Sequence, residues 1–260
     1  MDSSKHSTSG VKLLRYLASE GLKIFTVAQV REAAEQLHVQ GNYVVEALHH
    51  LHKEGWICRL KRGLYAFTAD SGFSSPPHEF EIAMALVNPC AISHWTAMHY
   101  HHLTQQVPNK IFAITPTGTP IPHRLTGDFY QFIQLKKEHC FGIEKIWIEQ
   151  SQVQMTDPER TLLDGLMTPQ HCGDFQEVLH AFKIHENKMN VQRAITYALQ
   201  LDCATIKRLG WVLERLGFNG SLLTPLLEAP INGYRRIDPT SPSVGPYDKK
   251  WMIQENIGAA

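Results

Sequence analysis

The sequence has no long apolar run, no surplus of either charge and no cysteines at paired spacing. A membrane span needs ~20 apolar residues, and no stretch of the chain comes near that length. The polar residues Met1–His6 do not resemble a signal peptide. We therefore expect a cytoplasmic protein without a membrane partner. Because the formal net charge is +0, any site for nucleic acid must be made by local charge.

Signatures of catalysis and metal binding are also missing. The five cysteines are scattered, with none in a Cys-x-x-Cys pair, which predicts reduced thiols. No G-x-S-x-G, G-x-x-x-x-G-K-[ST] or G-x-G-x-x-G motif occurs. A histidine cluster has neither H-E-x-x-H spacing nor an acidic member, so we interpret it as structural or surface histidines: His94, His99, His101 and His102. We expect no catalytic residue, no metal, no cofactor and no enzyme; a metal-dependent enzyme is the least favoured alternative.

The composition is that of a folded chain with about two domains. Hydrophobic residues make up 43% of the sequence, and charged residues make up 19%, which is too few for a disordered chain. The segment Asp70–Pro77 is rich in Ser, Gly and Pro and is typical of a linker. We place one domain at residues 1–70 and a second at residues 78–260.

The first domain has the pattern of a winged helix-turn-helix. Apolar residues at helical spacing begin at Val11 and stop at Gly21, and Thr26 resembles the N-cap of a second helix. A third helix is predicted from Asn42 to about Glu54, closed by Gly55. Two short strands follow, Trp56–Leu60 and Leu64–Phe67, and the tight turn between them contains a glycine. Three helices followed by a basic hairpin are typical of this DNA-binding fold.

The third helix has one apolar side and one polar side. At ~100° per residue, the apolar side comprises Val44, Val45, Leu48, Leu51 and Gly55, and we expect it to face the other helices. The opposite side comprises Asn42, Tyr43, Glu46, His49, His50 and Lys53. Its Asn, His and Lys side chains can contact base edges or phosphates in a major groove. The predicted wing adds three cations for phosphate or the minor groove: Arg59, Lys61 and Arg62. Double-stranded DNA is the predicted partner, and a winged helix that binds protein is the alternative.

The second domain is predicted to be α+β, with helices, an antiparallel-leaning sheet and a C-terminal helical bundle. Thr156 has capping-box spacing to Glu159, and we interpret Asp157 and Glu159 as residues that favour a helix start. Residues 116–126 are expected to form a mobile loop. Trp251–Ile253 resembles a short strand, and we interpret the C-terminal segment as an arm that returns to the sheet. The remaining predicted helices are 79–87, 95–100, 175–182, 191–201 and 205–216, and the strands are 110–115, 128–135, 143–149 and 152–155.

Several motifs in this order resemble the AbiEi-type antitoxins of type IV toxin–antitoxin systems. These segments are Arg62–Tyr65, Ile92–Thr104, Thr156–Asp164 and Ile237–Pro239, with Gly245 and Trp251. Ile237 stands where the family leads us to expect leucine. The resemblance implies an autorepressor that binds inverted repeats in its own promoter through the winged helix. It also implies that the C-terminal domain neutralises a nucleotidyltransferase-like toxin, in general without a stable complex. An inverted-repeat operator would bind two protomers, and these could form a dimer only when they are bound to the DNA. A regulator whose second domain senses a small ligand is the main alternative.

Overall fold

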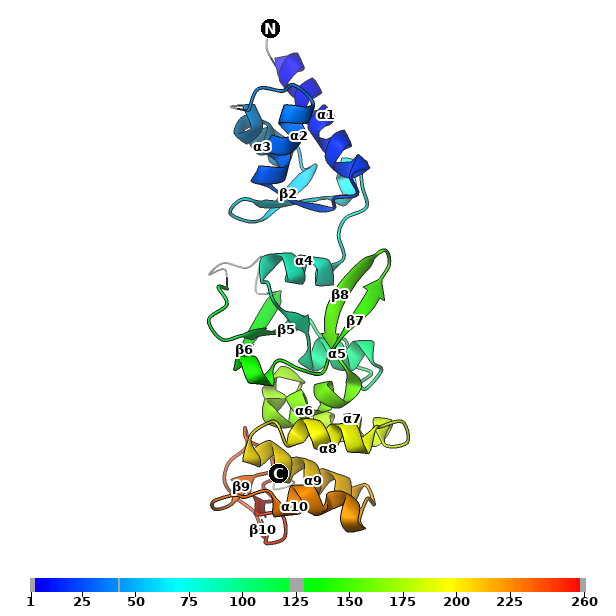
Figure 1. Cartoon of the computed structure of the whole chain (residues 1–260), viewed down its shortest axis with the longest axis vertical. Coiled ribbons are helices and arrows are strands. Elements are labelled where there is room, and N and C mark those ends of the chain that lie inside the picture. Colours follow the sequence, from blue (N-terminus) through cyan, green and yellow to red (C-terminus); the bar gives the residue numbers. More distant parts are fainter. Residues whose placement is uncertain (1–2, 42, 122–128, 258–260) are drawn as a thin grey trace. The chain divides into compact units, whose positions relative to one another are not determined.

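The computed structural model of the chain describes residues 3–41, 43–121 and 129–257. It separates into two compact units, of which the first runs to Asn88 and the second contains residues 89–119 and the chain from Phe129 onward. Figure 1 shows the helices and strands of both units. The first unit contains the helix that follows the predicted linker, and the limits 1–70 and 78–260 stay a prediction. Across the described ranges, no helix is both long and apolar enough to cross a membrane.

The first unit contains the three helices and the hairpin of a winged helix, as predicted. Thr26 is the N-cap of the second helix, and its capping box with Gln29 is complete because each side chain bonds the other's backbone NH. Gly63 has a φ of 78°, a conformation that allows the tight turn at the wing tip. The elements are α1 (Ser3–Ser19), β1 (Ile24–Thr26), α2 (Val27–Gln36), α3 (Tyr43–Lys53), β2 (Ile57–Lys61), β3 (Leu64–Phe67), η1 (Ala69–Ser71) and α4 (Glu79–Leu86). The strands form an antiparallel sheet in the order β1-β3-β2.

The core of the first unit corrects one part of the sequence interpretation. The buried face of α3 consists of Val44, Ala47, Leu48 and Leu51. Val45 was expected on this face, but it is 63% exposed. At ~100° per residue, Val45 lies beyond the edge of a stripe that the other four residues complete at spacings of three and four. Gly55 was placed on the same face, yet it is exposed and lies after the end of the helix.

The second unit is built on a five-stranded mixed sheet in the order β6-β5-β4-β8-β7. The strands are β4 (Ala91–Ile92), β5 (Ile111–Pro116), β6 (Tyr130–Leu135), β7 (Ile143–Ile148) and β8 (Ser151–Thr156). Two of the neighbouring pairs are antiparallel, β4 with β5 and β7 with β8, and two are parallel, β4 with β8 and β5 with β6. The sheet is therefore not antiparallel-leaning, as the sequence had suggested. The expected loop at 116–126 lies partly outside the described residues.

Helix α6 is the centre of the helical part of this unit. Its residues from Glu159 to Leu166 are all buried, and it contacts α5, α7, α8 and α9. The helices are α5 (His94–Tyr100), α6 (Pro158–Met167), α7 (Phe175–His185), α8 (Val191–Ala198), α9 (Cys203–Arg215) and α10 (Thr224–Glu228), with short 3-10 turns η3 (Lys137–His139), η4 (Pro169–His171) and η5 (Gly220–Leu223). These elements confirm the predicted α+β class and the helical C-terminal part.

The start of α6 differs from the predicted capping box. Asp157 is the N-cap, and its side chain accepts a 2.8 Å hydrogen bond from the backbone NH of Arg160. Thr156 is the last residue of β8, and its hydroxyl lies 2.8 Å from that of Thr161. Glu159 is 2% exposed and accepts a 2.8 Å bond from the NH of Asn190. Its carboxylate therefore ties α6 to the start of α8, a role beyond favouring the helix dipole.

The C-terminal segment forms a small sheet of its own and does not return to the five-stranded sheet. The strands β9 (Arg235–Arg236), β10 (Tyr247–Asp248) and β11 (Ile253–Gln254) lie in the order β10-β11-β9. Trp251 is fully buried against Gly210 in the middle of α9. The interpretation of the segment as an ordered arm was correct, but its destination is the helical part of the unit.

Candidate nucleic-acid interface

The exposed face of α3 carries most of the predicted DNA-contacting residues. Glu46, His49, His50 and Lys53 are all exposed. Tyr43, at the first turn of α3, is half-buried, and its pKa is raised, first by burial and then by the charge of Glu46. Asn42 lies outside the described residues. The hydrophobic stripe of α3 packs in the core of the first unit, so the helix presents this polar face from a fixed position.

Two further residues extend that face, and the sequence interpretation missed both of them. Val45 and His52 are exposed on α3. The Nδ1 of His52 lies 3.1 Å from the backbone oxygen of Ile57 and can donate to it, which holds the ring beside β2. At ~100° per residue, His52 falls within about 20° of Val45. Because Val45 was assigned to the apolar side, the neighbouring His52 was not predicted as part of the exposed face either.

The wing presents its three cations differently. Arg59 and Arg62 are exposed, whereas Lys61 is half-buried. The register between β2 and β3 shifts between Arg59 and Lys61, so the strand is irregular where the cations lie. The Lys61 amine donates a 2.7 Å hydrogen bond to the backbone oxygen of Leu86, at the end of α4. Lys61 is thus engaged within the first unit, and the two arginines are the exposed cations among the three predicted ones.

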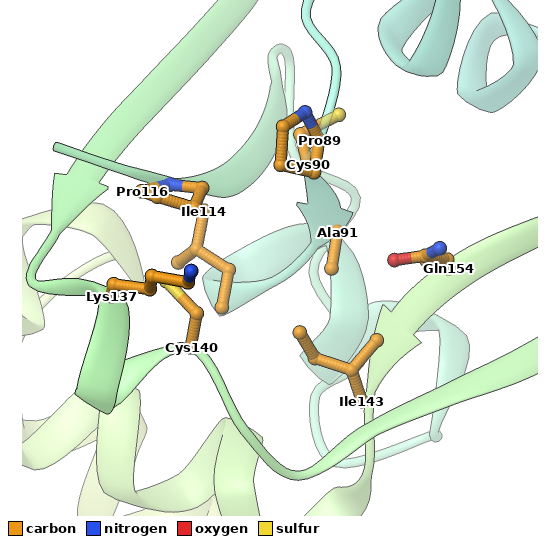
Figure 2. A pocket seen from close by; sticks show the side chains of 9 residues that line it. All are labelled: Pro89, Cys90, Ala91, Ile114, Pro116, Lys137, Cys140, Ile143 and Gln154. Atoms are coloured by element: carbon orange, nitrogen blue, oxygen red, sulfur yellow. The ribbon is translucent and has the colours of Figure 1, made fainter. Parts of the chain in front are cut away.

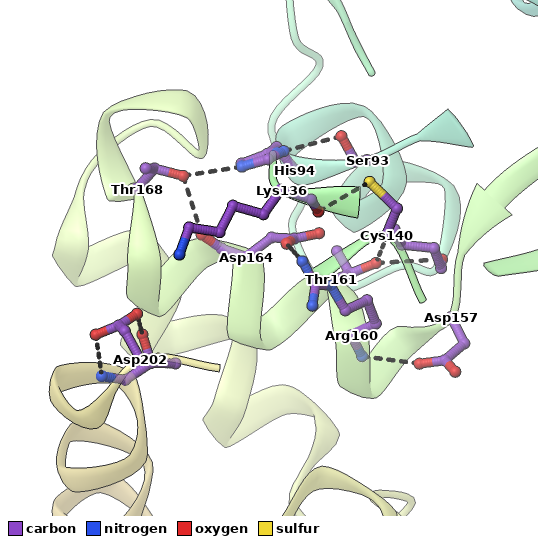
Figure 3. Close-up of polar contacts among 12 residues, drawn as sticks. Ser93, His94, Lys136, Cys140, Asp157, Arg160, Thr161, Asp164, Thr168 and Asp202 are labelled. Carbon is purple, nitrogen blue, oxygen red and sulfur yellow. Dashed lines mark hydrogen bonds and ion pairs between the residues drawn. The ribbon is translucent and has the colours of Figure 1, made fainter. Parts of the chain in front are cut away.

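The four histidines of the predicted cluster do not converge on one point. His94 is 1% exposed and lies between two hydroxyls, with Nδ1 2.8 Å from Ser93 Oγ and Nε2 2.9 Å from Thr168 Oγ1 (Figure 3). His101 donates from Nε2 to the backbone oxygen of Thr156 at 2.7 Å, and His99 and His102 are exposed. Burial, together with nearby His171 and Arg160, lowers the pKa of His94 well below its usual range. Within the described ranges, no three His, Cys, Asp or Glu side chains are placed to hold a metal ion.

A buried ion pair lies inside α6, in the same network. Arg160 Nη2 donates to Asp164 Oδ1 at 2.7 Å, and the two side chains are 0% and 1% exposed (Figure 3). The pair is incompletely satisfied, because Arg160 Nε and Nη1 and Asp164 Oδ2 have no hydrogen-bond partner among the described residues. Burial raises the pKa of Asp164 to about 6, although the charge of Arg160 acts in the opposite direction. We interpret this network as part of the structural core of the unit. A buried ion pair of this kind adds little net stability, because removing its charges from water offsets their attraction.

The three helices and the β2–β3 hairpin give the first unit the fold of a winged helix. Residues 12–68 match the family described as "Transcriptional regulator, AbiEi antitoxin". The match confirms the predicted resemblance over the winged helix. It ends at residue 68, so the likeness of the motifs in the second unit stays a prediction.

A solved structure is similar in fold over nearly the whole chain. The crystal structure of the RV2827C protein from Mycobacterium tuberculosis matches with a TM-score of 0.71 and 11% sequence identity. The match covers 95% of this chain and 90% of that protein. At this identity the likeness concerns the fold alone. No curated protein is similar enough to serve as a relative.

Proposed function

We propose that the chain is a DNA-binding autorepressor and the antitoxin of a type IV toxin–antitoxin system. The observation that carries this proposal is the exposed polar face of α3 beside two exposed wing arginines, within the region that matches a family of antitoxin regulators. Polar and basic side chains on a projecting helix suit a major groove. The proposed partners are double-stranded promoter DNA with inverted repeats and a nucleotidyltransferase-like toxin. The proposed location is the cytoplasm, and no enzymatic activity is assigned.

In this proposal the residues divide into those that read bases and those that hold the backbone. His49, His50 and Lys53 lie along the exposed face of α3 and would contact base edges or nearby phosphates. Arg59 and Arg62 would contact phosphates from the wing or enter the minor groove. Glu46 lies on the same face, and its negative charge disfavours contact with phosphate. It would therefore help to set the orientation of α3 on the DNA. Two protomers would occupy the two halves of an inverted repeat.

The DNA part of the proposal is tested with the full chain and the DNA upstream of its own gene. Fluorescence anisotropy at one fixed salt concentration compares this DNA with a scrambled duplex of equal length and composition. A specific regulator binds its site ~10³-fold or more tightly than other DNA. We expect a large preference of this kind for the native duplex. Equal affinity for the two duplexes would contradict operator binding and favour a winged helix that binds protein.

The antitoxin part has a separate test, because it rests on the family resemblance. The toxin would be encoded by a neighbouring gene, and co-expression with the full chain should restore growth that the toxin alone arrests. The Arg59→Ala/Arg62→Ala variant should lose repression but keep this rescue, since neutralisation is assigned to the second unit. Loss of rescue in that variant, with the protein still folded and present, would place neutralisation in the DNA-binding unit and contradict this division of roles.

A further inference from the structure

The second unit contains a cavity that the proposed function does not use. It has a volume of about 270 Å³ and is lined by Pro89, Cys90, Ala91, Ile114, Pro116, Lys137, Cys140, Ile143 and Gln154. Figure 2 shows these side chains around a common space, contributed by strands β4, β5, β7 and β8 and by the turn η3. The volume corresponds to roughly nine volumes of liquid water, enough for a ligand of about ten non-hydrogen atoms. All lining residues belong to one unit, so the cavity exists within a single folded body.

The floor of the cavity is apolar and held in place by the sheet. Ala91 and Ile114 are register partners across β4 and β5, and both are buried. Thr115 Oγ1 donates a 2.7 Å hydrogen bond to the backbone oxygen of Pro89, which holds the entrance to β4. Ile143, at the start of β7, is half-buried at the edge of the floor. A floor built on paired strands is formed before any ligand binds.

Two polar side chains lie at opposite sides of this floor. Figure 2 shows the Lys137 amine beside Cys140 and the Gln154 amide across the cavity from it. The carboxylate of the neighbouring Glu138 pairs with Lys136, 3.9 Å away, and not with Lys137. Within the part of the chain that the structure describes, the Lys137 amine has no hydrogen-bond or ion-pair partner. The cavity thus combines an apolar wall with one cation and one amide, and no acidic side chain lines it.

We propose that this cavity binds a small amphipathic monocarboxylate with a chain or ring of about eight carbons. The apolar part lies on Ala91, Ile114 and Ile143, where its removal from water is favourable. The carboxylate accepts a hydrogen bond from the Lys137 amine, the cation that lines the cavity. A cationic ligand would meet the charge of Lys137 with no acidic residue to offset it. A neutral ligand would leave the charge of the Lys137 amine without a counter-charge.

The inference is tested by isothermal titration of the full chain with octanoate, which has ten non-hydrogen atoms. For a ligand of this size we expect a Kd between about 0.01 and 1 mM. Octanamide has the same shape without the charge and should bind about five- to tenfold more weakly, since hydrogen bonds to charged groups are the stronger ones. Octylamine and acetate should not bind measurably. Absence of octanoate binding at 5 mM, or equal affinity for octanoate and octanamide, would overturn the proposal.

Variants assign the binding to this cavity. Lys137→Met keeps an unbranched side chain and removes the charge, so octanoate affinity should fall about five- to tenfold and octanamide affinity should fall less. Lys136→Met is the matched control, because Lys136 is exposed and does not line the cavity. Ile143→Phe enlarges a half-buried lining residue and should weaken both ligands. A loss of octanoate affinity in Lys136→Met equal to that in Lys137→Met would refute the assignment. The test requires no DNA, so its failure is distinct from failure of operator binding.

Discussion

The Lys61 amine in the wing and the backbone oxygen of Leu86 at the end of α4 are joined by a 2.7 Å hydrogen bond. The last carbonyls of a helix lack intrahelical partners and carry a partial negative charge, so a lysine amine is a favourable partner. A second link joins the winged-helix sheet to α4, because the Lys23 amine, next to β1, lies 3.4 Å from the Glu81 carboxylate. The Lys61 amine therefore already has one of its donors engaged by this carbonyl, whereas Arg62 has no such partner among the described contacts.

Replacing Lys61 and Arg62 of the wing separately should give unequal effects on DNA binding. Each phosphate contact contributes about 0.9 to the slope of log affinity against log salt concentration. Arg62→Ala should reduce that slope by about one and weaken binding to every sequence. Lys61→Ala should change the slope by less than half as much, since its amine is already engaged by Leu86. Anisotropy titrations at four or more salt concentrations measure both slopes, with Lys249→Ala as a control.

The opposite order of the two salt-slope effects would also have a specific structural meaning. If Lys61→Ala lowered the slope more than Arg62→Ala, the Lys61 amine would contact phosphate despite its bond to Leu86. The wing would then contact phosphate through the lysine, and the account of the exposed arginines would be wrong.

Changes on the exposed face of α3 should separate affinity from sequence preference. Glu46→Ala removes a negative charge beside the DNA and should strengthen binding to all duplexes by about two- to fivefold, equivalent to up to ~1 kcal/mol. His49→Ala should relax preference at one base pair in each half-site, because a base contact contributes about 1–3 kcal/mol of discrimination. Binding to a set of single-base operator variants measures both effects. An unaltered preference in His49→Ala would remove this histidine from the reading face.

Gly210 should not tolerate even a methyl group. Its added Cβ would lie 2.0 Å from the ring of Trp251, which is fully buried. Glycine to alanine inside a helix ordinarily stabilises by about 1 kcal/mol. Here overpacking should dominate, and Gly210→Ala should lower the free energy of unfolding by about 3 kcal/mol. Chemical denaturation of the full chain measures the change. Gly41→Ala, where nothing lies within 4 Å of the added Cβ, should stay within about 0.5 kcal/mol of wild type.

Asp164 should make the stability of the second unit fall as pH rises. Burial raises its pKa from 3.8 to about 6, so the folded state favours the protonated form. Its contribution is fully present below the unfolded value near 4 and is lost as the pH passes about 6. Relative to Asp164→Asn, wild type should lose on the order of 3 kcal/mol between pH 4 and pH 7. Urea denaturation of both proteins across this range gives the difference, and a constant difference would show that Asp164 is ionised throughout.

The sequence predicted those features of the winged helix that depend on local residues. The N-cap at Thr26, the strand Leu64–Phe67 and the turn at Gly63 all follow from neighbouring residues, and all are present. The short strand β1 was not predicted, because its three residues are defined by pairing with β3. The bond of Lys61 to Leu86 could not be predicted either, since it joins residues 25 positions apart.

The second unit was harder to predict because its order depends on distant pairings. Strand β4 has two residues and exists through its partners on β5 and β8. That strand determines the mixed topology, which local alternation of apolar residues does not reveal. Trp251 packs against Gly210, where the missing side chain leaves room for its ring. This space exists only once α9 has folded, so the sequence alone does not indicate where Trp251 packs. Thr156 had the spacing of a cap, but its strand continued one residue further, and Asp157 took the role.

A footprint of the full chain on the DNA upstream of its own gene tests the central claim most directly. The account predicts two protected half-sites whose centres are about one helical turn, ~10 base pairs, or a multiple of it apart. It also predicts that the protection disappears in the His49→Ala/Arg62→Ala variant at the same protein concentration. Uniform protection without boundaries, or an identical footprint for the variant, would contradict operator reading through α3 and the wing.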